Sequence, residues 1–452
     1  MALEQLYRHD WTSYRPGLLY FIGGAIYNVF FHHLSKFPGL VLHRNSRIPY
    51  SYKCLRGTLP FDILDLHERF GDILRVAPDE LAVADPNAWK DIMGYGAKEM
   101  EKAIYFFMPI EGSPANLVNE KGEVAKRLRR HLAPCFSGKA TRDQQPLIKK
   151  YVDVFIDKLH EMRTAETPLE SSASRTWFKT IFSANHFTQI LQELAFYLIL
   201  KAIIVALLSK SSKEAFEEQQ RQAKEKQMRR MEVGHPRPDL IERLIQKKNE
   251  LNLSLDNLVS NGESLIIGGS ETMATTLIRS IFKSESEIDL VSVRKLTYTF
   301  ACLDEGMRLY PPVAPGLPRV VPEGNATVLV QYVPGNTYIA VHQWPLYRRK
   351  ASFADAEQFH PERVMGDPRF ADDLLTAFQP FHISPRDCIG KTLAYGEMRL
   401  GLARLLFNFD LKIADDSLDW VQQKGELNAH LTPVQRCLSV IIWPAYSNQR
   451  VY

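Results

Sequence analysis

One cysteine, Cys388, stands in a segment whose residue types suit metal ligation. The segment reads Pro380-Phe-His-Ile-Ser-Pro-Arg-Asp-Cys-Ile-Gly390 and leads directly into a helical pattern that begins at Lys391. A helix N-terminus directs backbone N–H groups and a partial positive charge towards the residues before it. We therefore expect a lowered pKa for the Cys388 thiol, and such a thiolate can be the single axial ligand of a haem iron. A buried, inert cysteine at a helix start is the alternative.

A second group of reactive residue types is Gly268-Gly-Ser-Glu-Thr272, within a long helical pattern. Two adjacent glycines inside a helix cost about 2 kcal/mol relative to alanines, so another interaction should offset that cost. One explanation is a groove in which a planar ligand or O2 approaches the backbone. Glu271 and Thr272 would then supply a carboxylate and a hydroxyl that relay protons. A close helix crossing with a polar surface residue is the alternative.

A third group pairs charges along one helix face. Glu305 and Arg308 are three residues apart, so their side chains are neighbours on a helix. Either they form an exposed ion pair worth under about 1 kcal/mol, or they form a buried pair that also holds Arg363. Arginine suits the second arrangement because its planar fork can bond a carboxylate and a carbonyl together.

In this order along the chain, the three groups resemble the cytochrome P450 family of haem-thiolate monooxygenases. The haem-binding loop of that family is matched by Phe381, Arg386, Cys388 and Gly390. The resemblance implies that Cys388 ligates the iron of haem b and that Glu271 and Thr272 line its oxygen side. It also implies that Glu305, Arg308 and Arg363 form a network that braces the cysteine loop.

Haem carries two propionate groups, and the resemblance implies three cations that face them. By motif position these are Arg129, in the basic helical segment Arg127-Leu-Arg-Arg130, then Arg319 and Arg386. The same basic helix can also dock an acidic flavoprotein that supplies electrons.

The chain departs from the family pattern at several places. Ser384 stands where the family usually has glycine, Ala125 where an aromatic residue or histidine is usual, and Met273 where a hydroxyl residue is common. Family segments are also expected to be missing at 163–175 and between Thr276 and Glu285. Either the chain is a compact variant of the family, or its gene was read with those segments left out.

Hydrophobic periodicity predicts a mainly helical fold with a minor β-sheet region, as in the resembled fold. Strands are predicted at 73–83, around a Pro-Asp turn, and near 326–333 and 337–342. Helices are predicted at these ranges: 60–71, from 85, 123–136, 149–162, 213–231, 255–282 and 296–309. The stretch 194–208 is apolar apart from Lys201.

Composition excludes several classes of protein. Lys and Arg total 56 and Asp and Glu total 52, a near balance that gives no sign of nucleic-acid binding. The five cysteines are far apart and form no CxxC pair, which argues against a disulfide framework or a zinc site and for a reducing compartment. No linker or repeat divides the chain, so one large domain is expected.

The N-terminal region is mostly apolar from Leu18 to Phe31 and is interrupted by Asn28. We assign residues 1–35 to an anchor or interfacial helix and residues 36–452 to the monooxygenase domain. Positive charges after the apolar stretch favour a cytosolic main body. The expected location is therefore the endoplasmic reticulum membrane.

The first functional hypothesis is a monomeric haem-dependent monooxygenase that oxidises an apolar small molecule. It would use O2 and electrons from an NADPH-dependent flavoprotein reductase. The resemblance to fungal members implies secondary metabolism and a terpenoid- or polyketide-like substrate. The alternatives are a haem-binding but catalytically impaired relative and a membrane-associated helical binding protein without haem.

Overall fold

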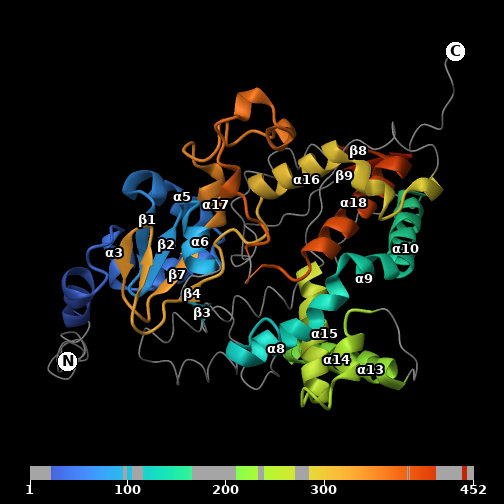
Figure 1. Ribbon diagram of the computed structural model, residues 1–452, viewed down its shortest axis with the longest axis horizontal. Coiled ribbons are helices and arrows are strands. Elements are labelled where there is room, and N and C mark those ends of the chain that lie inside the picture. The colour runs from blue at the N-terminus through green and yellow to red at the C-terminus, as the bar shows by residue number, and fades with distance from the viewer. Residues whose placement is uncertain are drawn as a thin grey trace, which may run out of the picture.

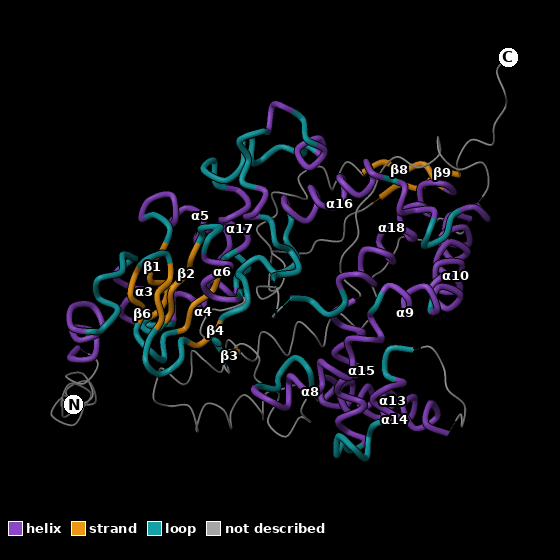
Figure 2. The backbone as a smooth tube through the Cα atoms, in the orientation of Figure 1, coloured by secondary structure: helices purple, strands orange, loops and turns teal. Residues whose placement is uncertain are grey.

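The computed structural model describes residues 22–94, 99–103, 116–164, 210–232, 239–269, 285–383, 385, 387–413 and 440–444. Within these ranges helices predominate over strands (Figures 1 and 2). The predicted mainly helical fold with a minor sheet is therefore confirmed. Several residues singled out in the sequence lie outside the described residues: the apolar stretch 194–208, Glu271, Thr272, Met273, Ser384 and Arg386.

A five-stranded sheet with strand order β1-β2-β7-β4-β3 forms one side of the molecule, at the left of Figure 1. Strands β1 and β2 pair antiparallel around the predicted Pro78-Asp79 turn, and β2 pairs with β7 in parallel. Strand β4 pairs antiparallel with both β7 and β3. The bounds are β1 (Ile73–Ala77), β2 (Glu80–Val83), β3 (Glu101–Lys102), β4 (Arg319–Val320) and β7 (Tyr338–Val341).

Short helices and a hairpin surround this sheet. Helix α5 carries Pro60 in its first turn and ends before Gly71, whose φ of +96° suits a residue without Cβ. Strands β1 and β2 are buried along their whole length. The surrounding elements are α3 (Val41–Asn45), α4 (Ile48–Leu55), α5 (Leu59–Phe70), α6 (Ala88–Met93), α17 (Gln343–Arg348), β5 (Ala326–Val328) and β6 (Gln331–Val333).

The N-terminal apolar stretch reaches this half as the π-helical turn η1 (Tyr27–Phe31). The Asn28 side-chain amide donates to the Asn45 carbonyl over 2.9 Å, and Arg75 donates to the Asn28 carbonyl over 2.7 Å. The polar residue that interrupts the apolar run thus fastens it to α3 and β1. Among residues that the structure describes, no helix is both long and apolar enough to cross a bilayer.

A second half is built from helices, from the lower centre to the right of Figure 1. The single helix predicted at 123–136 divides into α8 and the 3-10 turn η2, because Pro134 has no N–H to continue an α-helix. The elements are α8 (Gly122–Leu132), η2 (Ala133–Phe136), α9 (Gly138–Asp143), α10 (Gln145–Thr164), α13 (Lys210–Glu232), α14 (Glu242–Gln246) and α15 (Leu255–Gly269).

The C-terminal part connects the two halves through α16 and α18. Leu303 and Met307 of α16 belong to one apolar cluster with Met398 and Leu402 of α18. The elements are η3 (Glu285–Glu287), η4 (Ser292–Lys295), α16 (Thr297–Leu309), η5 (Pro361–Met365), η6 (Pro368–Phe370), η7 (Leu375–Ala377), α18 (Lys391–Asn408), β8 (Phe409–Ile413) and β9 (Val440–Pro444).

Candidate functional site

The loop before α18 holds Cys388 by backbone hydrogen bonds. The Cys388 N–H donates to the Phe381 carbonyl over 2.8 Å, and the Lys391 N–H donates to the Cys388 carbonyl over 3.3 Å. Helix α18 begins at Lys391, directly after Gly390. Cys388 is exposed, whereas the other described cysteines, Cys54, Cys135 and Cys302, are buried. The loop therefore presents one exposed cysteine at the start of a long helix.

The electrostatics of Cys388 correct one sequence expectation. The pKa of its thiol is raised, because the surrounding protein desolvates the sulfur even though part of the side chain is accessible. The N–H groups of Gly390 and Lys391 and the charge of Arg129 oppose this shift in the pKa. These N–H groups at the N-terminus of α18 lower the thiol pKa, as expected from the sequence, but desolvation raises it by more. The expected lowering of the thiol pKa is therefore wrong for the protein alone; a coordinated metal ion would deprotonate the thiol outright.

Two of the three predicted cations reach the cysteine loop. Arg129 on α8 forms an ion pair with Asp387, the residue before Cys388. Arg319 on β4 is only 3% exposed and lies close enough to His382 to lower the pKa of that imidazole. Helix α8 and the sheet thus both bring positive charge to the loop. The third cation, Arg386, lies outside the described residues.

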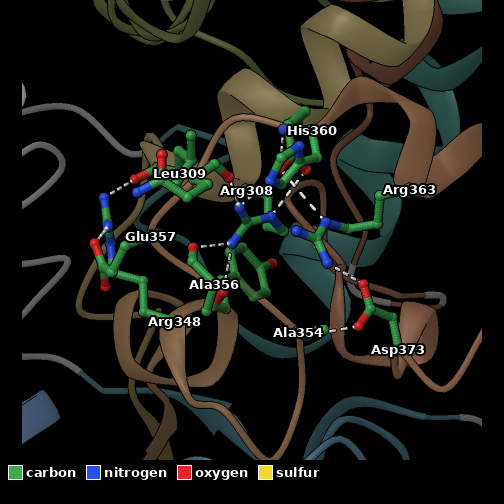
Figure 3. A network of polar contacts seen from close by, with 12 residues as sticks. Arg308, Leu309, Arg348, Ala354, Ala356, Glu357, His360, Arg363 and Asp373 are labelled. Carbon is green, nitrogen blue, oxygen red and sulfur yellow. Dashed lines mark hydrogen bonds and ion pairs between the residues drawn. The ribbon is translucent and has the colours of Figure 1, made fainter. Parts of the chain in front are cut away.

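Glu305, Arg308 and Arg363 meet in one buried network, part of which is drawn in Figure 3. Arg308 donates through Nε and Nη2 to the two carboxylate oxygens of Glu305, both over 2.8 Å. Arg363 donates to Glu305 over 3.4 Å and also pairs with Asp373. Glu305 is 1% exposed, so the alternative of an exposed surface pair is excluded.

Tyr347 joins this network to the cysteine loop, a role that no motif in the sequence predicts. Its backbone carbonyl accepts from Arg308 Nη1 over 2.8 Å, while its phenol oxygen accepts from the Gln379 N–H over 2.9 Å. The Gln379 carbonyl in turn accepts from the His382 N–H over 2.9 Å. A buried tyrosine needs a partner for its hydroxyl, but here the partner is 32 residues away. No local spacing could have revealed that contact.

Further contacts in the loop and in η7 just before it also come from distant elements. The indole N–H of Trp89 on α6 donates to the Ala377 carbonyl over 3.1 Å. The Phe381 ring lies 5.0 Å from the Tyr395 ring of α18. The predicted proton-relay residues, Glu271 and Thr272, lie outside the described residues.

Glu285, the first residue of the described range 285–383, is hydrogen-bonded to α18. Arg404 donates to Glu285 over 2.5 Å and to Asp153 of α10 over 2.6 Å. Asn408 also donates to Glu285, over 2.7 Å. The chain is thus fixed immediately after the stretch in which a family segment is expected to be missing.

Comparison with known proteins agrees with this arrangement. A sequence model of cytochrome P450 matches residues 52–282 and 278–437. The two matches meet within the 276–285 stretch where the chain departs from the family pattern.

Similar proteins come from fungi. Cytochrome P450 monooxygenase prhB of Penicillium brasilianum is 37% identical over 470 residues, covering 92% of this chain and 96% of the relative. That alignment is longer than the 452-residue chain, so the relative has residues that this chain lacks.

Two further relatives have comparable coverage. Cytochrome P450 monooxygenase tpeC of Talaromyces stipitatus is 34% identical, covering 91% of this chain and 92% of the relative. Trichothecene C-15 hydroxylase of Fusarium sporotrichioides is 31% identical, covering 92% of this chain and 96% of the relative. With the exposed Cys388 ahead of α18 and the buried network behind its loop, these matches lead to one conclusion: the chain belongs to the cytochrome P450 family.

Proposed function

We propose that Cys388 is the axial ligand of a haem iron in a monooxygenase that oxidises an apolar small molecule. The observation that carries the assignment is the exposed Cys388 at the start of α18, in a loop tied through Tyr347 to the buried Glu305 network. Members of the family use haem iron held by a cysteine thiolate. Three relatives named above are monooxygenases or a hydroxylase, which supports hydroxylation as the reaction.

The residues around Cys388 fit a haem. Within the described ranges, no three His, Cys, Asp or Glu side chains gather as metal ligands, so the accessible thiol suits a metal with one protein ligand. Arg129 and Arg319 bring positive charge to the loop that carries this thiol. Together with Arg386, they would hold the two propionates of the bound group.

When bound, the haem supplies O2 binding and activation, with the thiolate donating electron density that favours O–O cleavage. The protein's own residues have separate roles in this proposal. Glu271 and Thr272 move protons towards the oxygen side. Glu305, Arg308 and Arg363 hold the loop in position through Tyr347, and Phe381 packs on Tyr395 beneath it.

The electrons come from an NADPH-dependent flavoprotein reductase that docks on the basic face of α8. Lys126, Arg127 and Arg130 are exposed there, on the helix whose Arg129 pairs with Asp387. Complementary charges would steer an acidic partner to this face. Electrons would then arrive close to the cysteine loop.

The protein acts at the endoplasmic reticulum membrane, as a monomer with its catalytic domain in the cytosol. Ile22, Ile26, Phe30 and Phe31 expose large apolar surfaces in the segment assigned to the anchor, with Phe31 72% exposed. Apolar surface of this kind favours a membrane interface. The substrate is a product of fungal secondary metabolism with terpenoid- or polyketide-like character, in keeping with the trichothecene hydroxylase among the relatives.

The difference spectrum of the reduced, carbon-monoxide-bound protein tests the ligand. The wild-type protein should give the strongly red-shifted band of thiolate-bound haem, and Cys388→Ser should abolish it. Cys302→Ala is the matched control, because Cys302 is buried on α16. Persistence of the band in Cys388→Ser would show that another residue is the ligand.

Replacing Thr272 with alanine tests catalysis separately from haem binding. In an active enzyme the variant should keep the thiolate band but consume NADPH with more peroxide and less product. The impaired-relative hypothesis, which the interrupted family match at 278–282 keeps open, predicts equal NADPH consumption in both proteins.

A further inference from the structure

His382 occupies an unusual position in the cysteine loop. It follows Phe381 directly, has a φ of +59° and is only 7% exposed. Positive φ is uncommon for a residue with a Cβ, and such strain persists where surrounding structure or function requires it. Its N–H donates to the Gln379 carbonyl over 2.9 Å, so the backbone conformation is fixed.

The imidazole of His382 is held between an aromatic ring and a cation. The Trp89 ring meets it edge-on, with 5.2 Å between centroids and 82° between planes. Burial, followed by the charge of Arg319, lowers the pKa of His382 to about 3. The ring is therefore neutral at physiological pH and carries one N–H. Its Nε2 is buried and makes no hydrogen bond within the described structure.

A neutral imidazole beside a buried arginine suits one type of ligand well. A carboxylate there would accept an N–H from the ring and would also offset the positive charge of Arg319. Without such a group, the buried Nε2 carries an uncompensated desolvation cost. The family's cofactor brings two carboxylates, and the proposed iron ligand Cys388 is on the same loop.

We propose that the Nε2–H of His382 donates a hydrogen bond to a haem propionate, beside Arg319. This rests on the proposed role of Cys388 as iron ligand. His382 is then a cofactor-binding residue in addition to the three arginines. The loop residue with positive φ would serve both to shape the turn and to hold the cofactor.

Resonance Raman spectroscopy of the ferric holoenzyme tests this, because propionate bending bands respond to hydrogen bonds. His382→Gln places an amide N–H near the position of Nε2, whereas His382→Asn places it near Nδ1. The glutamine variant should keep the wild-type propionate bands and the asparagine variant should shift them. Equal bands in all three proteins would overturn the proposal.

The rate of haem loss gives a second readout. Loss of a charge-assisted hydrogen bond should speed transfer of haem to excess apomyoglobin by about ten-fold in His382→Asn, since 1.4 kcal/mol corresponds to a factor of ten. The glutamine variant should stay near wild type. Equal acceleration in both variants would indicate that His382 acts only by packing on Trp89.

His342 offers a matched control. It is also buried, its pKa is also lowered to about 3 by burial, and its Nε2 also makes no hydrogen bond in the described structure. It lies between β7 and α17, and the shift of its pKa does not involve Arg319. His342→Asn should leave the propionate bands unchanged. Because the thiolate band is recorded for every variant, failure of the Cys388 assignment remains distinguishable from failure of this one.

Discussion

Two neighbouring carboxylates on α16, Asp304 and Glu305, are both buried but are held differently. Glu305 accepts from Arg308, from Arg363 and from the backbone N–H of His360. Asp304 accepts from the Tyr395 hydroxyl over 2.7 Å. Burial raises the pKa of Asp304 to about 6, because desolvation outweighs the Tyr395 hydrogen bond and the charge of Arg399.

This difference predicts a pH-dependent effect of Asp304→Asn. The raised pKa means that protonated Asp304 favours the folded state fully below about pH 4. That contribution is lost as the pH rises through 6. The stability gained by the variant should therefore be small near pH 4 and grow towards pH 7, by on the order of 1 kcal/mol or more. Chemical denaturation at both pH values measures it, and a pH-independent difference would contradict the assignment.

At this scale the sequence predicted the residues that form local patterns. Glu305 and Arg308 were recognisable because they are one helical turn apart, and Cys388 because it precedes a helix. Tyr347 and His382 were missed, since their partners Gln379 and Trp89 meet them only in the folded chain.

At the scale of elements, Tyr347 connects the cysteine loop to α16. Its carbonyl accepts from Arg308 of α16, and its phenol oxygen accepts from the Gln379 N–H. Tyr347→Phe removes the acceptor of the Gln379 N–H with almost no change in volume. An unsatisfied buried N–H costs about 1–3 kcal/mol. We expect the variant to lose its thiolate-type carbon-monoxide band faster than wild type during mild heating.

Ile63→Val is the control for this prediction. Ile63 is fully buried in a separate apolar cluster around α5, and the substitution costs about 0.5–1.5 kcal/mol. It should lower the unfolding temperature without a selective loss of the band. If both variants lose the band in step with unfolding, Tyr347 has no special role in the loop.

The positions of most elements followed from periodicity alone. The helices predicted at 60–71, 149–162, 213–231 and 296–309 correspond to α5, α10, α13 and α16. The order of strands in the sheet could not be predicted, because β7 is inserted between β2 and β4 from far along the chain. Hydrophobic alternation marks a strand but does not identify its neighbour.

At the scale of the whole molecule, positive and negative charges nearly balance. Helix α8 nevertheless exposes a positively charged face formed by Lys126, Arg127 and Arg130. Reversing Arg127 and Arg130 to glutamate should slow reduction of the haem by the reductase about ten-fold or more at low salt. The effect should shrink as ionic strength rises. Stopped-flow reduction at several salt concentrations measures it.

A double reversal of Arg56 and Lys90 provides the control. Both residues are exposed and belong to the sheet half, near α4 and on α6. Their reversal to glutamate changes the net charge of the protein by the same amount as the reversal of Arg127 and Arg130. Equal slowing by both pairs would point to net charge rather than to a docking face.

The clamp formed by Glu285, Arg404 and Asp153 has a consequence for protein engineering. It fixes the chain to α18 and α10 immediately downstream of the 278–282 junction. We expect that residues inserted ahead of Glu285 leave this attachment to α18 and α10 intact. An insertion of this kind should keep the thiolate spectrum, which would make this junction a place to lengthen the chain without rebuilding the haem site.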